Sequence, residues 1–189
     1  MEESQLVRLV IQHDEQAFKA LFDSYAGMVY NTTLNLVQNQ EDAEDITQEV
    51  FVDISNKIES FKMESSLKTW IYRMTCNKAL EHIRKSKRKK RFGFLVSIDS
   101  DNDFLTQTDS SIEEGEDKVK LLHQLIQQLP ENQRLAFTLH HLDGLSYEEM
   151  AEVMETTLSA VESLMFRAKK NLKNKVALLN ERNEKVQLG

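Results

Sequence analysis

Residues 146–167, with the sequence SYEEMAEVMETTLSAVESLMFR, decide the fold of the C-terminal half of the chain. Ser146 followed three positions later by Glu149 is the sequence signature of a capping box, which predicts the start of a short helix. The inner-face positions then have the spacing of a helix-turn-helix, and they are Met150, Met154, Thr156, Val161 and Leu164. Ala151 is small where a second helix would cross closely. We therefore predict two helices, over about 146–154 and 158–178.

One residue departs from this pattern. Glu155 stands where the turn between the two helices usually has glycine, so we expect a strained or altered backbone there. A plain helical hairpin, without a role in recognition, is the alternative interpretation of this stretch.

Composition extends the helical prediction to the whole chain. The 189 residues include one proline and five glycines, and 40% are hydrophobic, which favours an all-α fold with real cores. Hydrophobic periodicity predicts further helices over about 3–12, from Asp14 onward, 27–38, 40–59, 66–90, 114–128 and 131–142. On the helix over 66–90, the predicted inward face consists of Leu67, Ile71, Thr75, Ala79 and Ile83.

An acidic segment divides the chain. Between Ser97 and Glu116 there is no Lys or Arg, while seven acidic residues fall among Ser, Thr and Asn. We predict two small helical domains joined by a flexible acidic linker and followed by a tail. The predicted bounds are 1–92 for the first domain, 93–114 for the linker, 115–180 for the second domain and 181–189 for the tail.

Several function classes are not favoured by the sequence. A single cysteine, Cys76, excludes an internal disulfide, and no Cys and His cluster has zinc spacing. The triplet Asp99, Asp101 and Asp103 is similar to the start of a calcium loop, but Phe104 stands where that loop requires glycine. No Gly-rich phosphate loop or nucleophile motif occurs, so we expect no enzyme activity, cofactor or small-molecule substrate. No apolar stretch approaches ~20 residues and the start is acidic, so we expect a cytoplasmic protein without membrane insertion.

Seven of the eight residues over 84–91 are basic, although the chain has a net charge of -7. Such a run repels itself unless a polyanion lies opposite it, so the run favours a nucleic-acid contact. Trp70 and Asn77 precede it on the same predicted helix, and they add stacking and hydrogen-bonding chemistry suited to a separated strand. Each feature also has an alternative interpretation without DNA. The cations could be a solvated helix end that suits the helix dipole, Trp70 could anchor the core, and Asn77 could hydrogen-bond a backbone group in the core.

The predicted helix over 40–59 has the opposite charge. Its first turns contain Glu41, Asp42, Glu44, Asp45 and Glu49, without a basic residue. This face could not approach phosphates without repulsion, so it suits a protein surface.

Three stretches together resemble a bacterial RNA polymerase sigma factor of the sigma-70 family, of the two-domain extracytoplasmic-function (ECF) type. Residues 42–51, DAEDITQEVF, resemble the segment that grips the coiled coil of the largest polymerase subunit. Residues 61–77, FKMESSLKTWIYRMTCN, with the basic run after them, resemble the segment that recognises and melts the -10 element. Residues 129–169 resemble the reader of the -35 element.

The resemblance implies three sets of binding residues. The implied site for core polymerase consists of Asp42, Glu44, Asp45, Gln48, Glu49 and Phe51. The implied -10 DNA site consists of Lys62, Ser65, Ser66, Trp70, Arg73, Asn77, Glu81, Arg84, Lys85, Lys87 and Arg88. The implied -35 DNA site consists of Ser159, Glu162, Ser163, Phe166, Arg167 and Lys170. Glu81 and Glu162 depart from the family pattern, so the promoter sequence cannot be copied from relatives.

The resemblance implies a transcription initiation factor without catalysis of its own. Its implied partners are promoter DNA, the coiled coil and flap region of core RNA polymerase, and an anti-sigma protein. The alternative is a helix-turn-helix regulator that binds DNA and never joins polymerase. Such a regulator usually carries a sensing domain, and residues 1–92 lack the alternating strand and helix pattern of a receiver.

The basic run generates a prediction about salt. Changing Lys87, Arg88 and Lys89 to Gln is expected to weaken binding to all promoters alike, because phosphate contacts contain no sequence information. The slope of log affinity against log salt is expected to flatten by roughly 0.7–0.9 for each phosphate contact that is lost. Titrations at several salt concentrations measure both effects, and a sequence-selective loss would contradict the phosphate role.

Overall fold

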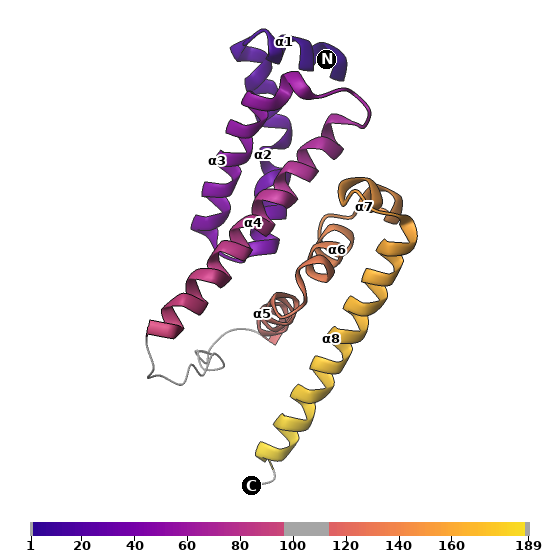
Figure 1. Cartoon of the computed structure of the whole chain (residues 1–189). Coiled ribbons are helices and arrows are strands. Elements are labelled where there is room, and N and C mark those ends of the chain that lie inside the picture. The colour runs from indigo at the N-terminus through magenta and orange to yellow at the C-terminus, as the bar shows by residue number, and fades with distance from the viewer. Residues whose placement is uncertain (1, 97–113, 188–189) are drawn as a thin grey trace.

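The chain is described by a computed structural model, which covers residues 2–96 and 114–187 and has no β-strand in them (Figure 1). The N-terminal half comprises α1 (Glu3–Ile11), α2 (Glu15–Val37), α3 (Gln40–Lys57), the short 3-10 helix η1 (Ile58–Ser60) and α4 (Leu67–Val96). The C-terminal half comprises α5 (Glu114–Gln127), α6 (Glu131–His141), α7 (Tyr147–Val153) and α8 (Leu158–Gln187). The predicted all-α class is confirmed.

Helices α2, α3 and α4 pack against one another around the core of the N-terminal half. The predicted inward face of α4 is confirmed, because Leu67, Ile71, Thr75, Ala79 and Ile83 are all buried. Helix α4 begins at a cap in which the Ser66 hydroxyl accepts a hydrogen bond from the Thr69 N–H at 3.0 Å. The Glu3 carboxylate accepts from the Leu67 N–H at 3.0 Å, so α1 also fixes the start of α4.

The sequence predicted separate helices on either side of residue 27, and this prediction was wrong. Helix α2 runs without a break for 23 residues through Gly27, which is exposed. A glycine inside a helix costs roughly 1 kcal/mol relative to alanine. Leu21 and Val29 are fully buried on either side of Gly27, and burying two such side chains outweighs that cost.

The helix-turn-helix of the C-terminal half has the predicted capping box. The Ser146 hydroxyl accepts from the Glu149 N–H at 3.2 Å, and the Ser146 N–H donates to the Glu149 carboxylate at 2.7 Å. The altered turn expected at Glu155 is also present, since its φ is 51°. Thr156 was predicted on the inner face but is exposed, because it follows this left-handed residue and lies in the turn itself.

Two helices are longer than the sequence predicted. Helix α4 continues through Gly93 to Val96, into the stretch assigned to the linker, and α8 continues to Gln187, into the stretch assigned to the tail. The rest of the predicted linker, over 97–113, lies outside the described residues, and so does the triplet that begins at Asp99.

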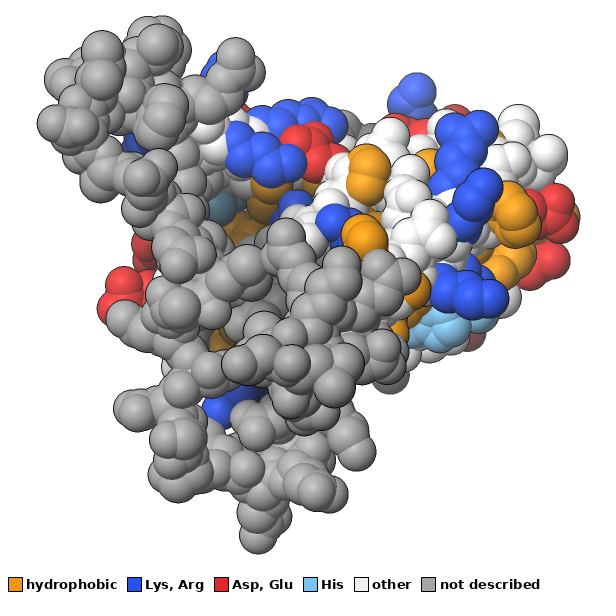
Figure 2. Space-filling view, turned by 90° about the horizontal axis from the view of Figure 1, so that it is seen from below, with side chains coloured by type: hydrophobic (Ala, Val, Ile, Leu, Met, Phe, Trp, Pro, Cys, Tyr) orange, Lys and Arg blue, Asp and Glu red, His pale blue; other side chains and the backbone are white. Residues whose placement is uncertain are grey.

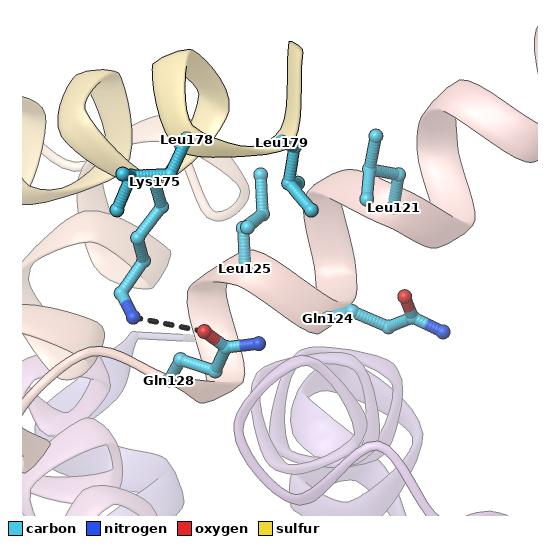
Figure 3. Close-up of a pocket in the computed structure, with 7 residues that line it drawn as sticks. All are labelled: Leu121, Gln124, Leu125, Gln128, Lys175, Leu178 and Leu179. Atoms are coloured by element: carbon cyan, nitrogen blue, oxygen red, sulfur yellow. Dashed lines mark hydrogen bonds between the residues drawn. The ribbon is translucent and has the colours of Figure 1, made fainter. Parts of the chain in front are cut away.

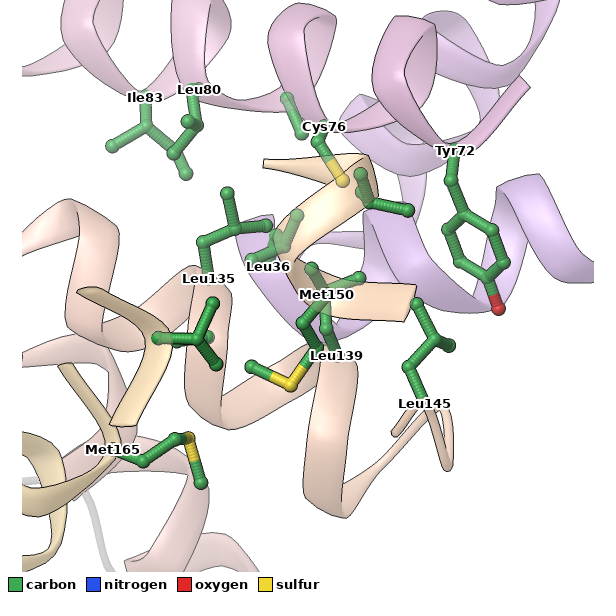
Figure 4. Close-up of a cluster of buried hydrophobic side chains, with 14 residues drawn as sticks. Leu36, Tyr72, Cys76, Leu80, Ile83, Leu135, Leu139, Leu145, Met150 and Met165 are labelled. Carbon is green, nitrogen blue, oxygen red and sulfur yellow. The ribbon is translucent and has the colours of Figure 1, made fainter. Parts of the chain in front are cut away.

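The two halves of the chain share one hydrophobic core (Figure 4). The N-terminal half contributes Leu36 from α2, and Tyr72, Cys76, Leu80 and Ile83 from α4. The C-terminal half contributes Leu135, Leu139, Leu145, Met150 and Met165. The two helical groups are therefore packed against each other, an arrangement that the linker composition did not predict.

A buried arginine also joins the two halves. Arg134 on α6 is only 2% exposed, and its guanidinium donates to the Leu36 carbonyl at 3.2 Å. The same guanidinium donates to the side-chain and backbone oxygens of Gln127 at 2.6 and 2.8 Å. The Gln127 amide donates to the Leu36 carbonyl as well, at 2.9 Å. A positive charge suits the C-terminal end of α2, where carbonyl groups lack partners within the helix.

Replacing Arg134 is therefore expected to destabilise the protein. Arg134→Met fills much of the same space but leaves the two Gln127 oxygens without this donor, so we expect a loss of about 3 kcal/mol in the free energy of unfolding. Urea unfolding measures the loss. Arg167→Met, at an exposed position on α8, is the matched control and is expected to change stability by less than about 0.5 kcal/mol. Equal unfolding midpoints would contradict a structural role for Arg134.

Candidate functional site

The acidic face of α3 is partly free and partly tied to α4. Glu44, Asp45 and Gln48 are exposed. Asp42 pairs with the His82 ring at 3.2 Å, and Glu49 pairs with the Lys78 ammonium at 3.2 Å. The carboxylates that do not contact α4 therefore lie on the outer side of the helix, where a partner protein can reach them.

Phe51, also predicted to contact polymerase, lies in the core. It is 4% exposed and packs against Phe22 with 4.6 Å between ring centroids. The apolar side chain that α3 presents to solvent is its neighbour Val52, which is 59% exposed. Helical periodicity signals this burial, because Phe51 falls on one stripe of the helix with Ile46, Val50 and Ile54, which are all buried, whereas Val52 lies off that stripe.

A basic residue on α4 organises the same surface. Lys78 pairs with Asp53 at 3.3 Å as well as with Glu49, and Lys57 donates to Asp53 at 2.9 Å. The hydrogen bond from Lys57 is the largest of the effects that hold the pKa of the Asp53 carboxyl below its usual value. These contacts fix α3 and α4 relative to each other around a shallow hollow that includes Asp45 and Val52.

The loop before α4 positions the first of the predicted -10 residues. Lys62 and Ser66 are exposed and Ser65 is half-buried. Trp70 is half-buried and packs against Phe61 with 5.3 Å between ring centroids. The indole is thus anchored on one side and accessible on the other, which fits both interpretations of this residue.

The remaining predicted -10 residues lie along α4. Arg73 is half-buried, whereas Asn77, Glu81, Arg84, Lys85, Lys87 and Arg88 are exposed. The exposure of Asn77 excludes the alternative in which it serves a backbone group in the core. Glu81 pairs with Lys85 at 2.9 Å, and this contact is the largest cause of the lowered pKa of the Glu81 carboxyl.

Helices α6 and α7 contact this face of α4. Arg73 Nε donates to the Glu152 carbonyl at 3.0 Å, and its guanidinium lies 3.8 Å from the Glu155 carboxylate. Glu131 accepts from Arg84 at 2.9 Å and from Lys87 at 3.2 Å. The bond from Arg84 is the largest cause of the lowered pKa of Glu131. Sequence reasoning missed these acceptors, because they are 44 to 79 residues away from their donors.

The predicted -35 residues form a single exposed stripe on α8. Ser159, Glu162, Ser163, Phe166, Arg167 and Lys170 follow one another at helical spacing, and all are exposed. Phe166 is 69% exposed and adds an aromatic side chain to the stripe. Figure 2 shows a face of the molecule on which Lys and Arg side chains lie among apolar, acidic and other side chains.

Two hollows accompany these surfaces. A groove of about 250 Å³ between α5 and α8 is lined by leucines and crossed by a 2.8 Å hydrogen bond from Lys175 to Gln128 (Figure 3). A polar hollow between the two halves contains Asp143, which accepts from the Thr32 hydroxyl at 2.7 Å and from the Asn35 amide at 3.5 Å. Burial raises the pKa of the Asp143 carboxyl.

The described residues contain no group of three or more His, Cys, Asp or Glu side chains placed to hold a metal ion. Among the same residues, no helix combines the length and the apolar character that crossing a bilayer requires.

Comparison with known proteins identifies relatives over most of the chain. The family described as "Sigma-70 region 2" matches residues 21–89, and the family described as "Sigma-70, region 4" matches residues 120–172. The ECF RNA polymerase sigma-E factor of Haemophilus influenzae is 32% identical over 177 residues, which cover 90% of this chain and 93% of that protein.

Two solved structures have a similar fold. One is CnrH in complex with the cytosolic domain of CnrY, with a TM-score of 0.66 and 17% identity over 95% of this chain and 97% of that chain. The other is the sigma factor RpoE in complex with the anti-sigma factor NepR from Bartonella quintana, with a TM-score of 0.63 and 23% identity over 85% of this chain and 96% of that chain.

Proposed function

Since the chain belongs to the ECF group of the sigma-70 family, we propose that its three surfaces divide the work of promoter recognition among α3, α4 and α8. The protein is a transcription initiation factor that binds core RNA polymerase and directs it to promoters, without catalytic activity of its own. The separation of charge between neighbouring helices supports the division, because α3 presents exposed acids and α4 presents exposed cations.

Helix α3 is the proposed polymerase contact. Glu44, Asp45 and Gln48 are exposed on one face, and Val52 adds an apolar side chain beside them. An acidic rim around an exposed apolar residue suits a basic protein surface and repels DNA. By family resemblance, the polymerase surface that α3 contacts is the coiled coil of the largest subunit.

The loop from Phe61 to Ser66 and the outer face of α4 are the proposed -10 surface. Trp70 offers an anchored ring for a base to stack on, and Asn77 offers an amide for a base edge. Arg84, Lys87 and Arg88 follow along the same helix and can neutralise phosphates. This order favours a separated strand over an intact duplex.

The exposed stripe of α8 is the proposed -35 reader. A recognition helix in the major groove needs side chains that project together from one face, and the stripe from Ser159 to Lys170 has that arrangement. The apolar groove between α5 and α8 offers a surface for the polymerase flap region, the second implied contact.

Regulation and location follow from the same family. The Bartonella quintana relative was solved with an anti-sigma factor, and a partner of that class is proposed for this chain. Its place of action is the cytoplasm, where polymerase and chromosome are found. The alternative of a regulator that never joins polymerase is not favoured. Residues 21–89 match sigma-70 region 2, and a regulator of that kind would not need this region.

Charge reversal on α3 tests the polymerase contact. Asp45→Arg is expected to abolish binding to core polymerase, because it places like charges together at the interface. The free energy of unfolding should change by less than about 0.5 kcal/mol, since Asp45 is exposed. Co-purification with core polymerase measures the loss, and Glu148→Arg, an exposed acid on α7, is the control. Undiminished retention of polymerase by Asp45→Arg would remove α3 from the interface.

Removing one side chain from the exposed stripe of α8 tests the -35 contact. Arg167→Ala is expected to weaken binding to -35 duplex without affecting polymerase binding, because Arg167 lies on the exposed stripe. A base contact predicts a loss of about 1–3 kcal/mol together with lower specificity, whereas a phosphate contact predicts a salt slope lower by about one. Affinity that is unchanged at every salt concentration would show that this side chain does not face DNA.

A further inference from the structure

We infer that the described arrangement is a self-inhibited form, in which helices α6 and α7 cover the -10 surface of α4 with acceptors that take the place of DNA phosphates. The inference rests on the proposed role of α4 and adds a regulatory contact to it. It follows from three observations: the partners of the α4 cations, the burial of an apolar stripe on α4, and the contrasting exposure of α8.

Three cations of α4 are bound by carboxylate and carbonyl oxygens of the other half. Arg84 and Lys87 both donate to Glu131, at 2.9 and 3.2 Å. Arg73 reaches the Glu152 carbonyl at 3.0 Å and lies near the Glu155 carboxylate. Anionic oxygens at hydrogen-bond distance from Arg and Lys are also what a nucleic-acid backbone offers. A bound strand and this half of the chain therefore compete for the same side chains.

The apolar contact beneath these pairs holds the halves together. Tyr72, Cys76, Leu80 and Ile83 recur at helical spacing along α4 and are buried in the core that both halves share. The cleft lined by Cys76, Asn77 and Arg84 from α4 is closed by residues of α6, α7 and α8. Asn77, the proposed base reader, thus lies at the edge of the contact with the C-terminal half.

The two contributions differ in strength. Pairs between exposed Arg or Lys and Glu contribute roughly 0.2–1 kcal/mol each, whereas burial of several large side chains contributes more. The apolar stripe therefore provides most of the stability of the closed form. The ion pairs contribute less, and they shift the equilibrium between the closed and open forms. Loss of the Glu131 pairs should shift the opening equilibrium by a measurable factor without separating the halves entirely.

The -35 stripe is not covered in the same way. Its residues from Ser159 to Lys170 are exposed, including Phe166 at 69%. The inhibition thus falls on the -10 surface, while the other DNA-binding surface remains accessible.

Cys76 provides a built-in probe of opening. It is the only cysteine of the chain and is 3% exposed in the shared core. Reagents that attack thiols can modify it only when the halves separate or the chain unfolds. The modification rate of the full chain therefore reports the opening equilibrium and needs neither polymerase nor DNA.

The experiment compares Glu131→Gln with Glu148→Gln, which removes the same charge from an exposed position on α7. We expect Glu131→Gln to speed Cys76 modification by roughly 2- to 10-fold, as the loss of two exposed pairs implies. Its affinity for a single-stranded DNA oligonucleotide should rise by a similar factor, because both readouts report the same equilibrium. Glu148→Gln should change either quantity by less than about twofold.

Two further variants separate opening from local unfolding of α6. Arg84→Gln removes the main Glu131 pair from the side of α4 and should also speed Cys76 modification. The double variant should add little to Glu131→Gln alone, since Glu131→Gln already removes the pair with Arg84. Fully additive rates would indicate independent destabilisation and would overturn the inference.

Other outcomes are equally decisive. Equal modification rates for Glu131→Gln, Glu148→Gln and the unmodified chain would show that the Glu131 pairs do not control opening, and the inference would fail. Faster modification without a gain in single-strand affinity would show that the halves open but do not hide a DNA surface, and would overturn the inference too. Failure of the proposed function itself would appear separately, as absence of co-purification with core polymerase.

Discussion

The packing of α4 on two sides is the constraint on which the rest of the structure depends. One face, with Leu67, Ile71 and Thr75, is buried among α2 and α3, and a second, with Tyr72, Cys76 and Leu80, is buried against α6 and α7. A helix that is apolar on two sides has only a narrow polar strip left for recognition. That strip contains Arg73, Asn77 and Arg84, so the residues proposed to meet DNA necessarily lie beside the contact between the halves.

Local signals in the sequence predicted much of the fold. The capping box at Ser146, the inward face of α4 and the unusual backbone at Glu155 each follow from a few neighbouring residues, and each is present. The stripe on α8 was also predictable, because its residues share one helix. The break at Gly27 was wrong, since burial on both sides overrides a weak local preference, and Thr156 lies exposed in the turn instead of on the inner face.

The contacts between the halves could not be predicted in this way. Glu131 lies 47 residues from Arg84, and Asp143 lies 111 residues from Thr32, so no periodicity links them. The acidic, polar segment between the domains indicated independence, because composition describes the connector and not the surfaces it connects. At short range, by contrast, periodicity separates two adjacent residues, since Phe51 belongs to the buried stripe of Val50 and Ile54 while Val52 lies off it and is exposed.

The unbroken course of α2 has a mechanical consequence. Its 23 residues form a rod of roughly 35 Å, capped by Asp14 at one end and contacted by Arg134 at the Leu36 carbonyl near the other. A rod without a joint cannot bend locally when the halves part. In the inferred separation of the halves, α2 would move as one piece, and the Leu36 carbonyl would exchange its Arg134 and Gln127 donors for water.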